Sequence, residues 1–174
     1  LERRNNDVIQ SSLKVLINAG YGVFGSDTFD FYCPPVAEST TAYARDAIKS
    51  TKNYVENTLG VDVLYGDTDS VFLYGPTEEQ ISKLLDWGLE NIGVELGTDY
   101  VFRYVVFSDR KKNYFGITTN GNIIVKGLMG KKSNTPQIIR KTFTNVLNIL
   151  KNVNNPDEFP IAREQIVNTL KQMV

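Results

Sequence analysis

The stretch Tyr65-Gly66-Asp67-Thr68-Asp69-Ser70 lies between two short runs of apolar and β-forming residues, 61–64 and 71–74. Two such runs on either side of a tight Gly-Asp-Thr-Asp turn predict a β-hairpin. Because side chains two positions apart on a strand point to the same face, Asp67 and Asp69 are expected to share one side near the tip. The sequence therefore predicts two neighbouring carboxylates held between strands that belong to a core.

Two carboxylates this close repel each other unless a cation lies between them. Mg²⁺ suits such a pair, because it takes one or two carboxylates, keeps water ligands and obtains the rest from a phosphate. The alternative is an ordinary turn, since Asp is common in turns, where its side chain bonds its own backbone. An EF-hand calcium loop beginning at Asp67 is excluded, because its sixth position would be Phe72, where that loop requires glycine.

The composition is that of an ordinary globular chain with one core: 174 residues, 41% hydrophobic and 22% charged. No apolar run reaches the ~18 residues of a transmembrane helix, and no apolar signal-peptide segment follows residues 1–6. The single cysteine, Cys33, excludes an internal disulfide, and the lack of histidine excludes histidine acid–base chemistry and His-ligated zinc. We therefore expect a cytoplasmic protein with no membrane partner.

Charge is distributed unevenly, although the net charge is only −1. Three basic clusters occur in the second half of the chain: Arg110-Lys111-Lys112, Lys131-Lys132 and Arg140-Lys141. The acidic residues Asp62, Asp67 and Asp69 lie in or near the predicted hairpin. Each cluster alone would be an ordinary solvated surface. Together, the basic clusters and the acidic cluster favour an enzyme that binds a polyanion and acts on it through a metal.

Residues 7–19 have the periodicity of an amphipathic helix, which Gly20 and Gly22 are expected to end. One arc is apolar and contains Ile9, Leu13, Leu16 and Ile17. A second arc is polar and contains Gln10, Lys14, Asn18 and Tyr21. The polar arc is either a solvated face or a site where Lys14 meets a phosphate and Tyr21 packs against a base.

Beyond the hairpin, helical periods alternate with short β-rich runs. Residues 100–107 carry apolar side chains on both faces and are predicted to form a central strand. The aromatic residues of the link after the first helix are expected in the core: Phe24, Phe29, Phe31 and Tyr32. Further helices are predicted at 36–58, 77–96, 136–152 and 160–174, and further strands at 114–118 and 122–126 around an Asn120-Gly121 turn.

Three segments resemble motifs of family B DNA polymerases of the archaeal type, in the order that this family has. Residues 65–70 resemble its motif C, residues 14–22 its motif B (Lys-x-x-x-Asn-Ser-x-Tyr-Gly), and residues 111–114 its Lys-Lys-x-Tyr motif. Ala19 stands where motif B has serine, so no role is carried over to it. Residues 124–136 resemble the link from palm to thumb.

The resemblance implies an α+β fold, with an antiparallel, ferredoxin-like palm sheet packed on helices. It implies three regions: the end of the fingers helix with motif B in residues 1–25, the palm in 26–134, and the start of a helical thumb in 135–174. It also implies DNA-directed DNA polymerase activity on primer–template DNA and deoxynucleoside triphosphates, in a cytoplasmic, nucleoid-associated protein.

Residue roles follow from the same resemblance. Asp69 is implied to be the metal-bridging catalytic carboxylate of a centre with two Mg²⁺ ions, which Mn²⁺ could replace, and Asp67 to be a less direct metal ligand. The residues implied to bind the incoming nucleotide are Lys14, Asn18 and Tyr21. Those implied to follow the minor groove and backbone of the primer end, contacts that carry no sequence information, are Lys111, Lys112 and Tyr114.

A two-metal centre needs a further carboxylate, which the family takes from motif A, Asp-x-x-Ser-Leu-Tyr-Pro, a string that this sequence lacks. The chain also starts without methionine and ends inside a predicted helix. We therefore expect a piece that is inactive alone and needs the remainder of the polymerase chain or a second subunit.

Two other classes of protein stay open. The first is another palm-type nucleotidyltransferase, such as a reverse transcriptase or a nucleotide cyclase, against which the Lys14 helix and residues 111–114 argue. The second is a non-catalytic DNA-binding module derived from a polymerase, which DNA binding without metal-dependent activity would favour.

Overall fold

The computed structural model describes residues 2–128 and 134–171, which fall into two compact units, Leu1–Leu96 and Gly97–Val174. The predicted Lys131-Lys132 cluster and the end of the last predicted helix lie outside the described residues. Helices and antiparallel strands occur in both units, so the α+β class is confirmed. The strands form two small sheets, one of two strands and one of three.

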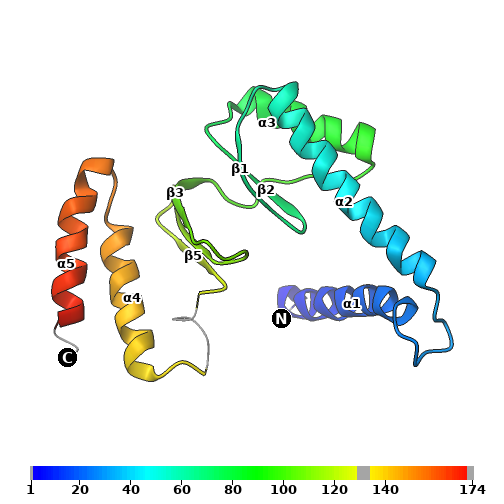
Figure 1. The fold of residues 1–174 in the computed structure, drawn as a ribbon, viewed down its shortest axis with the longest axis horizontal. Coiled ribbons are helices and arrows are strands. Elements are labelled where there is room, and N and C mark those ends of the chain that lie inside the picture. The colour runs from blue at the N-terminus through cyan, green and yellow to red at the C-terminus, as the bar shows by residue number, and fades with distance from the viewer. Residues whose placement is uncertain (1, 129–133, 172–174) are drawn as a thin grey trace. The chain divides into compact units, whose positions relative to one another are not determined.

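The first unit contains three α-helices, one hairpin and a π-helical turn (Figure 1). Its elements are α1 (Glu2–Phe24), α2 (Pro34–Asn57), β1 (Val63–Asp67), β2 (Ser70–Leu73), α3 (Glu78–Trp87) and η1 (Gly88–Ile92). α2 packs against β1, β2 and α3. The core of this unit is a buried cluster of Val55, Val61 and Leu84.

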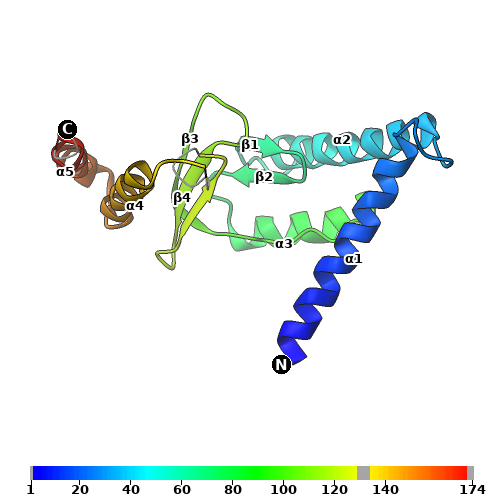
Figure 2. The same cartoon turned by 90° about the horizontal axis from the view of Figure 1, so that it is seen from below.

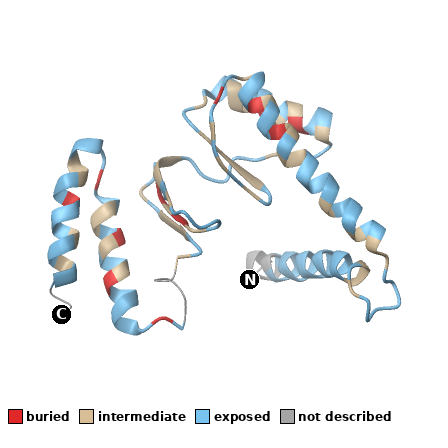
Figure 3. Ribbon diagram, viewed as in Figure 1, coloured by how far each residue is buried: buried red, intermediate tan, exposed pale blue. Residues whose placement is uncertain are grey.

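Helix α1 is longer than its sequence predicts. It continues through Gly20 and Gly22 to Phe24, because neither glycine adopts the left-handed conformation that would end it. A glycine inside a helix costs only about 1 kcal/mol, which a long helix tolerates. The apolar arc of this helix is exposed, with Leu16 71% and Ile17 74% accessible (Figure 3).

The link between α1 and α2 also differs from expectation. Phe29, Phe31 and Tyr32 are exposed, so the prediction that they belong to the core is wrong. The segment is closed locally by backbone turns, including Tyr32 N–H to Phe29 O at 3.0 Å and Cys33 N–H to Phe24 O at 2.9 Å. These turns place the rings on the surface of the loop.

Helix α3 begins as predicted and ends earlier. The Thr77 hydroxyl accepts the Gln80 N–H at 3.2 Å, and the Gln80 side chain accepts the Thr77 N–H at 2.8 Å, which completes a capping box. Gln80 also donates to Leu59 O at 2.9 Å, tying the start of α3 to the end of α2. The helix widens into η1 at Gly88, where a Cβ would lie 2.5 Å from Leu96, and Gly93 ends it at φ +73°.

The second unit consists of a three-stranded antiparallel sheet and two helices. Its elements are β3 (Phe102–Phe107), β4 (Tyr114–Thr118), β5 (Ile123–Lys126), α4 (Gln137–Lys151), the short 3-10 helix η3 (Pro156–Glu158) and α5 (Phe159–Lys171). The strand order is β3-β4-β5, so β4 is central and the prediction of β3 as the central strand is wrong. Apolar residues on both faces of β3 misled the prediction, because β3 pairs with β4 along one edge only, while Arg103 and Tyr104 of β3 reach the helices.

Helices α4 and α5 lie side by side and run in opposite directions (Figures 1 and 2). The end of α4 is held on β3 by two side chains. Tyr104 donates its hydroxyl to Leu150 O at 2.5 Å, and Arg103 donates to Lys151 O at 2.6 Å and to Asn154. A cation at the carboxyl end of a helix is favourable, because the last carbonyls there carry partial negative charge.

Candidate functional site

The two predicted carboxylates lie at the tip of the β1–β2 hairpin. The strands pair antiparallel with Asp67 opposite Ser70, so the two central turn residues are Thr68 and Asp69. The turn is therefore one residue later than the predicted Gly-Asp-Thr-Asp turn, and Gly66 belongs to β1 opposite Val71. The hairpin itself is confirmed, with an irregularity between Val63 and Tyr65.

The two carboxylates at the tip of the hairpin have different surroundings. One oxygen of Asp67 accepts the Thr68 N–H at 2.8 Å and the Thr68 hydroxyl at 3.2 Å. These two bonds to the next residue hold one oxygen of Asp67 at the start of the turn. Asp69 is exposed in the turn itself. The tip therefore presents one oriented carboxylate and one accessible carboxylate two residues apart.

These oxygens are the hard donors that Mg²⁺ prefers, but they form only part of a ligand set. Within residues 2–128 and 134–171, no group of three or more His, Cys, Asp or Glu side chains could hold a metal ion. Asp62 belongs to the same acidic stretch of sequence, yet it precedes β1 at the opposite end of the hairpin from the turn. The residues present thus fit a metal that takes one or two carboxylates from this chain and the rest from elsewhere.

Helix α1 carries the predicted nucleotide-binding side chains. Lys14 and Asn18 are exposed, and Tyr21 is 44% exposed in the last turn before Phe24. Their spacing puts them on one face of the observed helix, as predicted. The apolar arc is exposed as well, so burial does not distinguish the two faces. The nucleotide-binding role of the polar face stays a prediction.

The predicted DNA-binding residues lie in the second unit, in the loop between β3 and β4. Lys111 and Lys112 are exposed, whereas Tyr114 is the first residue of β4 and is only 9% exposed, with its ring 5.8 Å from that of Phe107. The loop is closed by the Ser108 N–H, which donates to Asn113 O at 3.0 Å. Two ammonium groups therefore stand on a tightly closed loop, and the aromatic ring beside them anchors its end.

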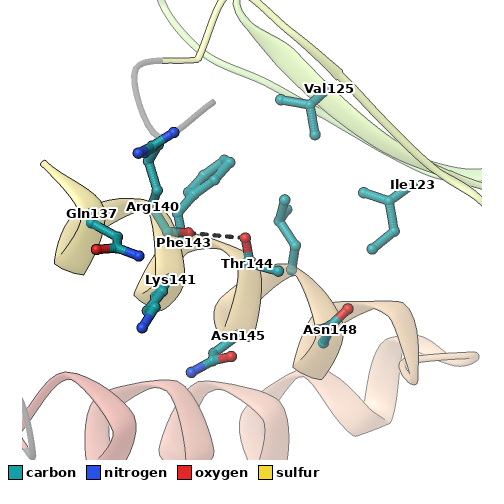
Figure 4. Close-up of a pocket in the computed structure, with 10 residues that line it drawn as sticks. Ile123, Val125, Gln137, Arg140, Lys141, Phe143, Thr144, Asn145 and Asn148 are labelled. Carbon is teal, nitrogen blue, oxygen red and sulfur yellow. Dashed lines mark hydrogen bonds between the residues drawn. The ribbon is translucent and has the colours of Figure 1, made fainter. Parts of the chain in front are cut away.

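A groove of about 600 Å³ lies between β5 and α4 (Figure 4). Its floor is apolar and includes Ile123, Val125, Phe143 and Leu147. The helix side is polar, with two cations, three amides and one hydroxyl: Arg140, Lys141, Gln137, Asn145, Asn148 and Thr144. The Arg140-Lys141 pair predicted as a basic cluster therefore borders this groove.

The Arg140-Lys141 cluster at this groove belongs to a longer stretch of sequence that lacks acidic residues. Residues 110–156 contain nine lysines and arginines and not one aspartate or glutamate. Such an acid-free stretch is typical of sequences that form a polyanion-binding surface. The amide and hydroxyl side chains of α4 add neutral donors, which commonly contact phosphate oxygens.

The full length of the chain, residues 1–174, matches DNA polymerase family B. DNA polymerase 1 of Sulfurisphaera ohwakuensis is 42% identical over 172 residues, which cover 99% of this chain and 20% of that protein. DNA polymerase 1 of Aeropyrum pernix is 45% identical over 157 residues, covering 90% of this chain and 16% of that protein. Within the described residues, no helix combines the length and apolar character that crossing a bilayer requires.

A solved structure gives the same answer for the fold. The family B DNA polymerase from the hyperthermophilic archaeon Pyrobaculum calidifontis superposes with a TM-score of 0.72 at 31% sequence identity, over 99% of this chain and 21% of that one. The chain thus spans about a fifth of the length of the relatives it matches. The motifs, the fold and the match along its whole length place this chain in DNA polymerase family B.

Proposed function

We propose that this chain provides the metal-binding hairpin and part of the DNA-binding surface of a DNA-directed DNA polymerase. The observation that carries the proposal is the Asp67-Thr68-Asp69 turn, with one carboxylate oriented by the Thr68 N–H and hydroxyl and the other exposed. Membership of family B and the names of the relatives support it.

In this proposal Asp69 would be the principal ligand of a centre with two Mg²⁺ ions, which Mn²⁺ could replace, and Asp67 would be a secondary ligand. When bound, the metals lower the pKa of the primer 3′-hydroxyl and neutralise charge on the attacking and leaving oxygens. Thr68 fixes the Asp67 side chain, and Ser70 closes the turn by pairing with Asp67. The pairing of Asp67 with Ser70 closes the hairpin and leaves Asp69 two residues from Asp67 in the turn.

In this proposal each unit contributes its own substrate-binding side chains. Lys14 contacts the triphosphate as a point charge, with Asn18 one turn further along the helix and Tyr21 under the nascent base pair. Lys111 and Lys112 neutralise phosphates of the primer–template duplex. Tyr114 is largely buried, so its main part in this contact is to anchor the loop at β4.

In this proposal the metal centre of the chain alone is incomplete, which is supported by the finding that no third carboxylate is grouped with the hairpin pair among the described residues. A two-metal mechanism requires such a ligand from another segment. We therefore propose that activity depends on the remainder of a polymerase chain or on a second subunit. The isolated 174 residues should show no Mg²⁺-dependent primer extension.

The test is primer extension by a complete family B polymerase that carries this segment, with Asp69→Asn and Asp67→Asn compared with Asp62→Asn as the control. Asp69→Asn should slow synthesis by at least about 100-fold, as expected when a group that stabilises transition-state charge is removed. Asp67→Asn should cost less, and Asp62→Asn should have little effect. Near-normal synthesis by Asp69→Asn would remove this residue from the metal centre.

Two further results would overturn parts of the proposal. Robust synthesis by the isolated 174 residues would show that the chain needs no outside carboxylate. DNA binding without any synthesis, even when the rest of the polymerase is supplied, would instead indicate a non-catalytic DNA-binding module.

A further inference from the structure

The residue after β5 adopts an unusual backbone conformation. Gly127 has φ +67°, and the N–H of Leu128 donates to Lys126 O at 2.8 Å, which makes Gly127 the centre of a three-residue γ-turn. The γ-turn form with a positive central φ is the rarer and more strained of the two. Since Lys126 pairs with Tyr114, this turn lies beside the start of β4, where the loop carrying Lys111 and Lys112 ends.

The loop that carries Lys111 and Lys112 also contains a residue with an unfavourable backbone conformation. The N–H of Asn113 donates to Arg110 O at 3.3 Å, which forms a tight turn over residues 110–113. The Asn113 side chain donates to Lys111 O at 2.9 Å. Among the described residues, Lys112 is the only non-glycine with positive φ, at +63°. Left-handed backbone is unfavourable for a lysine by roughly 1–2 kcal/mol, so the surroundings must hold it there.

The two turns meet at the α-carbon of Gly127. A Cβ built on Gly127 would lie 2.1 Å from the carbonyl oxygen of Lys112 and 3.0 Å from both the Lys112 carbonyl carbon and Asn113 Oδ1. The closest atom is backbone, so it cannot move aside as the end of a flexible side chain would. The Lys112 peptide therefore rests where any side chain at position 127 would be.

We infer that Gly127 is a positioning residue for the Lys111-Lys112 phosphate contact: its missing side chain makes room for the Lys112 carbonyl and so keeps Lys112 left-handed. The inference rests on the proposed DNA-binding function of those two lysines. A side chain at 127 would push the Lys112 peptide away and turn both ammonium groups from their directions, without removing either charge.

A simpler explanation is that Gly127 is needed only for its positive φ. Gly121, in the β4–β5 turn of the same sheet, separates the two explanations. Its φ is +74°, but among the described residues the only atom within 4 Å of a built Cβ is Lys151 Cε, near the end of a flexible side chain, at 3.7 Å. Alanine at Gly121 thus also has to adopt a positive φ, as alanine at Gly127 does, but it displaces no peptide.

The experiment measures affinity for a primer–template duplex as a function of salt, in a complete family B polymerase carrying this segment. Gly127→Ala should weaken binding about tenfold, the worth of a hydrogen bond to a charged group. It should reduce the slope of log affinity against log salt by about 1, the signature of one lost phosphate contact. Gly121→Ala should lower thermal stability less, because it adds no clash with backbone, and should leave both binding quantities unchanged.

The variant Lys111→Gln with Lys112→Gln distinguishes the inference from the function on which it rests. If this double change leaves affinity and salt slope unaltered, the proposed DNA contact fails, whatever Gly127 does. If the double change weakens binding but Gly127→Ala behaves like Gly121→Ala, the DNA contact stands and the inference is wrong. In a chain that already carries Lys111→Gln and Lys112→Gln, Gly127→Ala should cause no further loss of the salt slope, because its effect depends on those two lysines.

Should Gly127→Ala fail to fold, Gly127→Asn and Gly121→Asn replace the pair. Asparagine tolerates positive φ better than alanine but still places a Cβ against the Lys112 carbonyl. A lower salt slope for Gly127→Asn alone supports the inference, and equal slopes for the two asparagine variants overturn it.

Discussion

Glu158 illustrates how a single carboxylate organises the corner between α4 and α5. Its two oxygens accept the Asn154 N–H at 2.8 Å and the Asn155 side-chain amide at 3.2 Å. The bond from the Asn154 backbone holds the pKa of Glu158 below its usual value, with a smaller contribution from the Asn155 side chain. The folded corner therefore favours the ionised carboxylate.

The lowered pKa has a consequence for stability against pH. Because the folded pKa is below the unfolded one, the stabilisation is fully present above the unfolded value of about 4.3 and is lost as pH falls through the folded pKa. Glu158→Gln should therefore reduce stability at neutral pH and converge with the parent chain in acid. Asp157→Asn removes the same charge one residue away but leaves the Asn154 and Asn155 bonds to Glu158 in place, so it should cost less at neutral pH than Glu158→Gln. Urea unfolding at several pH values measures this; identical profiles for Glu158→Gln and Asp157→Asn would contradict it.

At the scale of elements, two side chains of β3 attach the end of α4 to the sheet of the second unit. Tyr104 donates its hydroxyl to Leu150 O, and its ring lies 5.4 Å from that of Phe159 at the start of α5. Burial raises the pKa of Tyr104, so its hydroxyl remains a donor at any ordinary pH. The neighbouring Arg103 reaches the same helix end, although its Nε atom is buried without a partner.

Deleting that hydroxyl tests the attachment. Tyr104→Phe keeps the ring contact with Phe159 but leaves Leu150 O without this donor, which should cost about 1 kcal/mol of unfolding free energy. Tyr100→Phe makes the same chemical change on a side chain that is 49% exposed and should be nearly neutral. Denaturant unfolding followed by circular dichroism compares the two; equal stability would show that the hydroxyl bond adds nothing to the attachment.

At the scale of the whole molecule, burial is concentrated in a few places. Val55 and Ile117 are fully buried, whereas α1 exposes both its apolar and its polar arcs. A helix in a protein gains most of its stability by packing its apolar face, so a helix whose apolar face is exposed lacks that stabilisation. Local stability should therefore differ widely along the chain.

Hydrogen exchange of the 174-residue chain makes that difference measurable. Amides of α1 should have protection factors at least about tenfold lower than those of residues 51–57 in α2 and of the central strand β4. The two reference segments contain buried residues and serve as internal controls within the same sample. Uniform protection across α1, α2 and β4 would mean that α1 is stabilised by something other than its own contacts.

Local signals in the sequence predicted most elements correctly, because their causes are local. Alternation and turn residues predicted the Asp67–Asp69 hairpin, Thr77 and Gln80 predicted a capped helix start, and Pro136 predicted the start of α4. The three polymerase motifs predicted the family, since each is a short string whose chemistry needs its residues in order.

What the sequence could not determine depends on neighbours far along the chain. Hydrophobicity shows that Leu16 and Phe31 prefer burial, but only the tertiary structure decides whether another segment covers them. The central position of β4 depends on pairing with strands on both sides, which the composition of β3 concealed. The close approach of Gly127 to Lys112 joins residues 15 positions apart, and a glycine in a sequence does not reveal which backbone atom occupies the space left by its missing side chain.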